Sequence, residues 1–167
     1  FRTPAVFDVV AVAPRLRLAL ANVYRNGEAG GGTWTDDLDA ALRRADAEAR
    51  ADGAALFLVL HPWILPGVGD DPEKGVIAGA DRARDTVAAC AAVAAVFAGH
   101  RHMNRVRLLG DCLCIDTACL IGYPLGFREI EVGDDGWLAC RWHTLDLPDL
   151  LQASRARSGA EENHRLA

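Results

Sequence analysis

The chain has 167 residues, of which 51% are hydrophobic and 25% are charged, and its formal net charge is -5. This composition is typical of one soluble globular domain, and the acidic balance argues against the broad basic surface that nucleic-acid binding needs. No stretch reaches the roughly 18 to 20 apolar residues of a membrane span. We therefore expect a cytoplasmic domain with neither a nucleic-acid footprint nor a membrane span.

Two strands and a helix are predicted in the first third of the chain. Val6–Val12 and Arg15–Asn22 have the patterns of strands, and the alternation of arginine with leucine in the second favours a hairpin. The glycine-rich stretch Tyr24–Thr33 lacks the Gly-Lys-Ser/Thr of a P-loop and is expected to be a loop. Thr35 is a typical N-cap residue for a helix that ends at Gly53. The apolar stripe of this helix is formed by Leu38, Ala41, Leu42, Ala45 and Ala49.

A parallel β-α-β unit is predicted in the middle of the chain. Ala55–Leu60 and Val93–Ala98 are continuous apolar runs with the length of strands buried on both faces. A helix is expected between them, from about Ala80 to Ala91. Parallel strands joined by a helix end at the same edge of their sheet, and in open α/β sheets ligands bind beyond that edge. Residues that directly follow these two strands are therefore candidates for a functional site.

Three of the five histidines follow these strands. His61 comes after the first strand, and Gly99-His100-Arg101-His102 comes after the second. In extended chain, His100 and His102 would project to one side about 6 to 7 Å apart at the backbone. Their rings could then converge on one metal ion, or on two ions about 3.5 to 4 Å apart. The structural alternatives are a solvated loop with two incidental histidines and, for His61, a core histidine bonded to the backbone.

The last third of the chain is predicted to be rich in strands. The expected strands are Arg105–Leu109, Cys112–Asp116, Phe127–Val132 and Trp137–His143. A hairpin turn at 133–136 would join the last two, Pro148 would begin a short helix, and Ser154–Ala167 would be a frayed polar tail. The five cysteines lack the C-x2-C spacing of a zinc site, so we interpret them as small buried hydrophobic residues.

These residues together resemble the C-terminal half of a calcineurin-like metallophosphoesterase. Gly99-His100-Arg101-His102 is similar to the Gly-His-x-His signature of that family, and His61-Pro62-Trp63 is similar to its upstream histidine motif. The stretch Ile121–Val132 resembles the segment that closes the second sheet, and the whole resemblance runs from about Ala5 to Leu145. The family often reads His-x-Pro, and anchoring the comparison on Pro62-Trp63 would put the ligand position on Leu60 instead of His61.

The resemblance implies an α/β fold, part of a layered α/β/β/α sandwich. It implies hydrolysis of a phosphate ester by two divalent or trivalent metal ions, iron, manganese or zinc. His61, His100 and His102 would be metal ligands, and Arg101 would contact the substrate. The N-terminal motifs of the family, Asp-x-His, Gly-Asp-x-x-Asp and Gly-Asn-His, are absent. We therefore expect residues 1–152 to be the C-terminal portion of the domain, residues 153–167 to be a polar tail, and the isolated chain to be inactive without the missing N-terminal half.

Two further functions remain open from the sequence. The chain could be a remnant of the family that serves as a non-catalytic interaction module. It could also be a mononuclear zinc hydrolase that uses the three histidines alone, with water in the fourth position. His143 lies among apolar residues near the end of a predicted strand, and we expect it to have a structural role.

Overall fold

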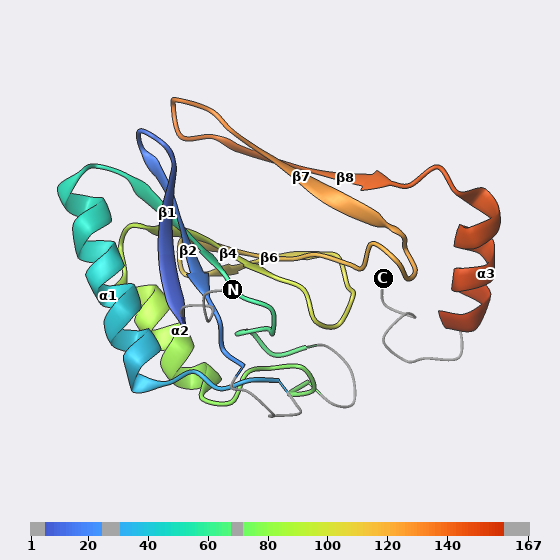
Figure 1. The fold of residues 1–167 in the computed structure, drawn as a ribbon, viewed down its shortest axis with the longest axis horizontal. Coiled ribbons are helices and arrows are strands. Elements are labelled where there is room, and N and C mark those ends of the chain that lie inside the picture. The colour runs from blue at the N-terminus through green and yellow to red at the C-terminus, as the bar shows by residue number, and fades with distance from the viewer. Residues whose placement is uncertain (1–5, 25–30, 68–71, 159–167) are drawn as a thin grey trace, which may run out of the picture. The chain divides into compact units, whose positions relative to one another are not determined.

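The computed structural model describes residues 6–24, 31–67 and 72–158, which are drawn as a ribbon in Figure 1. The chain divides into two compact units, and each is described by itself. The first consists of Phe1–His100 and Val106–Ile115, and the second of Arg101–Arg105 and Asp116–Ala167. Among the helices in the described part of the chain, none combines the length and apolar character needed to cross a membrane.

A six-stranded mixed sheet is the centre of the first unit. Its strands are β1 (Phe7–Ala13), β2 (Leu16–Ala21), β3 (Ala55–Val59), β4 (Val93–Ala98), β5 (Arg105–Leu109) and β6 (Cys112–Asp116). They stand in the order β1-β2-β3-β4-β6-β5. β1 and β2 form the predicted antiparallel hairpin, and β3 and β4 form the predicted parallel pair. β2 also pairs with β3 in parallel, so three neighbouring strands end at one edge of the sheet.

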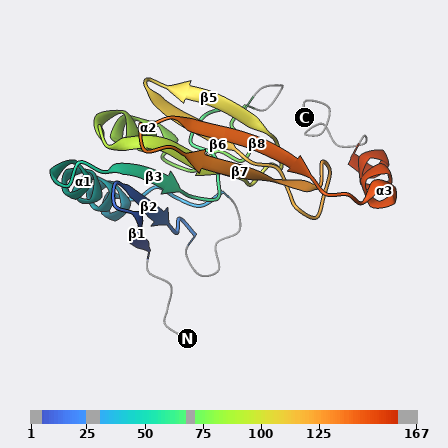
Figure 2. The same cartoon turned by 90° about the horizontal axis from the view of Figure 1, so that it is seen from above.

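Two helices cross between these parallel strands. α1 (Asp36–Ala51) connects β2 to β3, and α2 (Ala80–Ala89) connects β3 to β4. The predicted N-cap of α1 is confirmed, because the side chain of Thr35 accepts a hydrogen bond of 3.3 Å from the Leu38 backbone N–H. This bond satisfies one of the N–H groups that a helix start leaves without a partner. α2 ends two residues earlier than expected. Both views place α1 and α2 next to each other (Figures 1 and 2).

The hydrophobic core lies between these helices and one face of the sheet. All five residues of the predicted α1 stripe are buried, and alternate residues of β3 meet them, with Leu42, Leu56 and Leu58 each 0% exposed. Full burial of one leucine contributes about 1.5 to 3 kcal/mol. Phe57 lies between Leu56 and Leu58 in the strand, so its side chain projects from the other face. There its ring contacts the ring of Phe97 at 5.4 Å between centroids.

A buried carboxylate joins α1 to the start of β4. Asp46 is 5% exposed, and its Oδ1 accepts a hydrogen bond of 2.7 Å from the backbone N–H of Ala92. Its Oδ2 pairs with Arg50 at 3.0 Å. Because Ala92 directly precedes β4, this contact fixes the strand that leads to the histidine motif.

The second unit contains a hairpin and a helix. β7 (Gly126–Val132) and β8 (Leu138–Thr144) pair in antiparallel, and the predicted turn at 133–136 is present, with a hydrogen bond of 2.9 Å from Gly136 N–H to the Gly133 carbonyl. α3 (Pro148–Ser158) begins at the expected proline. It continues into the segment that we expected to be a frayed tail. Residues 159–167 of that tail, and 25–30 of the glycine-rich loop, lie outside the described residues.

Candidate metal centre and adjoining pocket

The candidate site lies where β3 and β4 end. Backbone hydrogen bonds continue the pairing of the two strands past their last residues, from Leu60 N–H to the Phe97 carbonyl at 3.1 Å and from Gly99 N–H to the His61 carbonyl at 2.9 Å. The segments carrying His61 and His100 are therefore held side by side. The expectation that the two strands bring these histidines together is correct.

Trp63 holds the segments that carry His61 and His100 together through hydrogen bonds. Its side chain is 0% exposed, and its indole Nε1–H donates a hydrogen bond of 3.0 Å to the Gly99 carbonyl. The guanidinium of Arg107 lies over its ring, 5.9 Å from the centroid. The backbone of Trp63 also pairs with the segment before α2, through Gly75 at 3.1 Å and Ile77 at 2.9 Å. The tryptophan therefore fixes the residue directly before His100 to the residues that follow His61.

A second set of backbone hydrogen bonds connects the loop after β2 to the same segment. Thr33 N–H donates to the Val23 carbonyl at 3.0 Å, and Trp34 N–H donates to the Ala78 carbonyl at 2.8 Å. Thr33 and Ala78 form an isolated parallel bridge, as do Trp63 and Val76. The segment Val76–Ala78, which we name the linking segment, therefore bonds to the loops that follow both β2 and β3.

The rings of His61 and His100 meet edge to face. Their centroids are 5.0 Å apart and their planes are at 90°. Each Zn–N bond is about 2.1 Å long and an imidazole centroid lies about 1 Å beyond its nitrogen, so two rings on one tetrahedral zinc have centroids about 5 Å apart. Two imidazoles this close are compatible with one shared ion. His61 is exposed and His100 is half-buried, so the pair is accessible from solvent.

The backbone of the histidine motif differs from the extended chain that we expected. His100 has φ +53° and His102 has φ +56°, which is the left-handed region that residues with a Cβ rarely adopt. The expected geometry, two rings projecting from one side of an extended segment, is therefore wrong. Left-handed residues other than glycine cluster at functional sites, where the surrounding structure holds them against a cost of about 1 to 3 kcal/mol. Two left-handed residues within one four-residue motif therefore support the interpretation of this segment as part of a functional site.

His102 and Arg101 belong to the second unit, whereas His61 and His100 belong to the first. His102 is exposed and Arg101 is half-buried. The chain after them is anchored by Asn104, whose side-chain oxygen accepts hydrogen bonds from the Ala118 backbone at 3.1 Å and from Arg128 at 3.2 Å. Of the predicted ligands, the structure brings His61 and His100 together, and His102 is placed only within its own unit.

The described ranges contain no group of three or more histidine, cysteine, aspartate or glutamate side chains arranged to hold a metal ion. The residues that the structure describes therefore fit a partial site, built on the imidazoles of His61 and His100. Cys112 and Cys114 are buried on β6. The hydrogen bond with Cys114, together with burial, raises the pKa of the Cys112 thiol, so Cys112 remains protonated.

His143 has the environment of a structural residue. Its Nε2 lies 2.7 Å from Glu129 Oε2 across the β7–β8 hairpin. Its ring stacks on Phe127 with centroids 5.1 Å apart and planes at 18°. Both contacts hold the hairpin together, which makes His143 a suitable reference histidine for the site.

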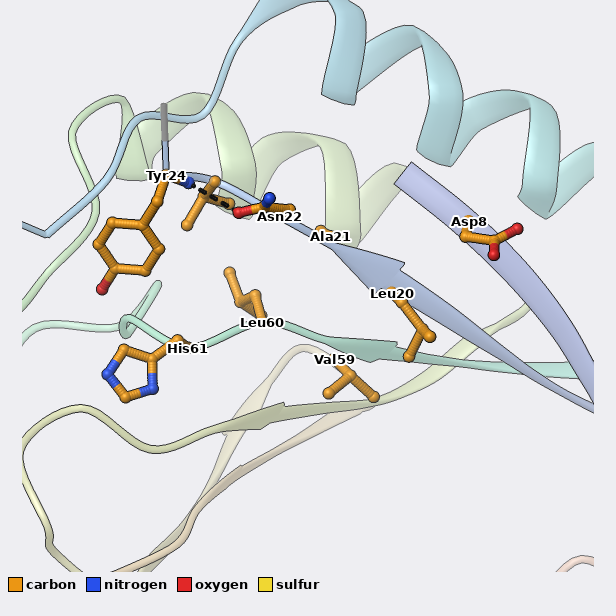
Figure 3. Close-up of a pocket in the computed structure, with 9 residues that line it drawn as sticks. Asp8, Leu20, Ala21, Asn22, Tyr24, Val59, Leu60 and His61 are labelled. Carbon is orange, nitrogen blue, oxygen red and sulfur yellow. Dashed lines mark hydrogen bonds between the residues drawn. The ribbon is translucent and has the colours of Figure 1, made fainter. Parts of the chain in front are cut away.

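A pocket of about 660 Å³ opens beside His61 (Figure 3). It is lined by Asp8, Leu20, Ala21, Asn22, Val23, Tyr24, Val59, Leu60 and His61. The ring of Tyr24 lies 5.9 Å from that of His61, and burial raises the pKa of its phenol, so the hydroxyl stays neutral at physiological pH. Asn22 and Tyr24 were not predicted from the sequence as site residues. They follow β2 as His61 follows β3, and that position was the signal that could have found them.

The first unit of this chain has a mixed α/β fold built on a mixed sheet. Among solved structures, the chain is similar to a dimetal phosphatase from Danio rerio, with a TM-score of 0.66 and 13% sequence identity over 81% of this chain. This chain spans 57% of the length of that phosphatase. No protein-family model matches the sequence, and no curated protein matches it.

Two larger proteins align with lower TM-scores. One is a sulfate thiohydrolase from Thermus thermophilus, with a TM-score of 0.48 and 16% identity. The alignment covers 95% of this chain and 29% of that protein. The other is a 5'-nucleotidase from Staphylococcus aureus, described as putative, with a TM-score of 0.47 and 13% identity. The alignment covers 93% of this chain and 34% of that protein.

Proposed function

We propose that this chain is part of a metal-dependent hydrolase of phosphate esters. In this proposal His61, His100 and His102 are metal ligands. Arg101 holds the phosphate through its planar guanidinium, which matches two oxygens at once. The observation that carries the proposal is the meeting of the His61 and His100 rings, 5.0 Å apart, beyond the carboxyl ends of two parallel strands. The fold shared with a dimetal phosphatase supports it.

The histidines suit this role by their chemistry. A neutral imidazole binds a metal through one ring nitrogen and can donate a hydrogen bond from the other. Metal ions at such a site lower the pKa of bound water and stabilise charge on phosphoryl oxygens. Iron, manganese and zinc all accept imidazole ligands together with carboxylates. The hydrogen bond from Trp63 to the Gly99 carbonyl would help to hold the His100 ring in place for binding.

A dinuclear site needs more ligands than these three residues provide. Three neutral imidazoles do not offset the charge of two metal ions, and no carboxylate joins the His61–His100 pair within the described residues. We propose that the remaining ligands come from outside the described residues, from a segment corresponding to a part of the dimetal phosphatase that this chain does not cover. That segment would be the partner of this chain in the complete site.

The first test measures metal binding by the chain itself. Titration of Mn²⁺ or Zn²⁺ into the 167-residue protein should show weak binding, and His61→Ala, His100→Ala and His102→Ala should each lower the affinity at least about 10-fold. His143→Ala serves as the matched control, because this histidine is engaged with Glu129 and Phe127. Equal affinities in His100→Ala and His143→Ala would contradict the assignment of the ligands.

The second test measures hydrolysis of an aryl phosphate with and without the segment that supplies the remaining ligands. We expect turnover only when that segment is present, and loss of most turnover in His100→Ala and in His102→Ala. Tight binding of one zinc ion and turnover by the 167-residue chain alone would favour a mononuclear zinc hydrolase. Absence of metal binding and of turnover from both proteins would favour a non-catalytic interaction module.

A further inference from the structure

We propose that the pocket beside His61 binds a planar aromatic ring, carried by the alcohol part of a phosphate-ester substrate. The statement that the ring belongs to a substrate rests on the proposed function, whereas the binding of the ring to the pocket does not. The pocket lies next to the candidate metal ligands because His61 contributes to both. One neighbour of its ring is His100, at 5.0 Å, and another is Tyr24, at 5.9 Å.

The size and lining of the pocket suit a small organic group. Its volume of about 660 Å³ falls within the range of about 300 to 1,000 Å³ that small-molecule sites occupy. Leu20, Val59 and Leu60 give it apolar walls. The polar side chains in the lining are those of Asp8, Asn22, Tyr24 and His61, and in such sites isolated hydrogen bonds orient the ligand.

The aromatic residues indicate how a ring would lie. A third ring stacked between Tyr24 and His61 would need about 7 Å between the centroids of their rings, because stacked carbon atoms approach to about 3.5 Å. The observed separation is 5.9 Å. A bound ring therefore packs against the sides of Tyr24 and His61 that line the pocket, and it contacts Leu20 and Val59 with its other face.

The polar groups of the pocket favour a neutral ring that carries both a hydrogen-bond acceptor, for Asn22, and an N–H donor, for Asp8. Asn22 uses its side-chain oxygen to accept a hydrogen bond of 3.2 Å from Tyr24 N–H. Its amide nitrogen donates to no other group among the described residues and is available to a ligand. Asp8 lies at the end of the pocket away from Tyr24 and His61 (Figure 3). Its carboxylate accepts N–H groups and repels anions.

The direction of the substrate follows from this arrangement. The phosphate would lie on the His100 side of His61, and the ring would lie on the Tyr24 side. The substrate class is therefore a phosphate ester of an alcohol bearing an amino-substituted heteroaromatic ring, of which a nucleoside is an example. A phosphate ester of a simple sugar would leave the apolar walls without a partner.

The test uses adenosine and D-ribose as probes, because neither carries a phosphate and their binding does not depend on metal ions. Saturation-transfer NMR on the 167-residue protein should show tighter binding of adenosine than of ribose. Tyr24→Ala should raise the Kd of adenosine about 3- to 10-fold, the effect of losing one aromatic contact. Leu20→Ala should raise it about 3-fold. Tyr24→Phe keeps the ring and should bind nearly as the wild type does.

Val10→Ala is the matched control for the apolar wall. Val10 is 42% exposed on the neighbouring strand and does not line the pocket, so its removal should leave the Kd unchanged. If Tyr24→Ala does not fold, Leu20→Ala against Val10→Ala still tests the pocket. Equal binding of adenosine and ribose, or equal Kd values in the pocket variants and Val10→Ala, would overturn the proposal.

The variant His100→Ala separates this proposal from the proposed function. It should retain the adenosine affinity of the wild type while losing metal affinity. If the metal titrations contradict the ligand assignment but adenosine binding still depends on Tyr24 and Leu20, the ring-binding pocket stands and the hydrolase is wrong. The opposite pattern would overturn the pocket and leave the metal site standing.

Discussion

Replacing Trp63 by phenylalanine tests whether this residue holds the candidate site together. The tryptophan is 0% exposed, and its indole N–H donates to the carbonyl of Gly99, the residue before His100. Phenylalanine keeps an aromatic ring at this position and removes the donor together with part of the ring volume. The substitution therefore isolates the hydrogen bond and a small packing defect.

The expected cost follows from these two losses. The partly buried carbonyl of Gly99 would lose its hydrogen-bond partner, which costs about 1 to 3 kcal/mol. The smaller ring leaves a cavity of roughly 40 Å³, which at about 24 cal/mol per Å³ adds about 1 kcal/mol. We therefore expect Trp63→Phe to lower the free energy of unfolding by about 2 to 4 kcal/mol.

Urea denaturation followed by far-UV circular dichroism measures this change without relying on tryptophan fluorescence. Trp137→Phe is the matched control, since Trp137 is 45% exposed on the β7–β8 hairpin, and it should cost less than about 0.5 kcal/mol. Metal affinity should also fall in Trp63→Phe, because the backbone that carries His100 is released. If the two variants had the same stability and the same metal affinity as the wild type, the supporting role of Trp63 would be refuted.

Two other predictions concern stability. Burial, with a smaller effect of Asp46, raises the pKa of the Cys90 thiol to about 11. The protonated thiol is favoured in the folded state, so its contribution is complete below about pH 8.5 and is lost as the pH rises through about 11. The stability of the wild type relative to Cys90→Ala, measured by urea denaturation, should fall by about 2 to 3 kcal/mol over this interval; a constant difference would show that the thiol ionises normally. Gly126→Ala should destabilise the hairpin by about 2 kcal/mol or more, because its Cβ would lie 2.2 Å from the His143 carbonyl oxygen. Gly136→Ala has open space but φ +91° and should cost only about 1 kcal/mol; NMR spectra of β7 and β8 that changed equally in both variants would contradict this ranking.

The elements that could be predicted from the sequence are those whose signals are local. Thr35 and the apolar stripe after it determine α1 within a few turns, so its start and its buried face were predicted correctly. The apolar runs of β3 and β4, separated by a helix, predicted a parallel pair and therefore the closeness of His61 and His100. In both cases, sequence neighbours or a short crossover carry the necessary information.

The backbone geometry of the histidine motif depends on distant contacts and could not be predicted in this way. The left-handed angles of His100 and His102 are held by the structure around them, including the hydrogen bond from Trp63 to Gly99. The role of β2 was also only partly predicted. We expected it as one strand of a hairpin, whereas its pairing with β3 places Asn22 and Tyr24 at the edge where ligands bind. No short motif marks these two residues.

The linking segment Val76–Ala78 has a consequence for how this fold tolerates insertions. It bonds to Trp63 on one side and to Gly32 and Trp34 on the other, so it connects two loops that carry site residues. An added residue inside the segment would shift one set of bonds against the other and move His61 relative to Tyr24. An added residue at Glu73 or Lys74, where the chain turns before the segment, would leave both sets intact. Length changes in homologous chains should therefore concentrate before Val76, and the spacing from Val76 to Ala78 should stay constant.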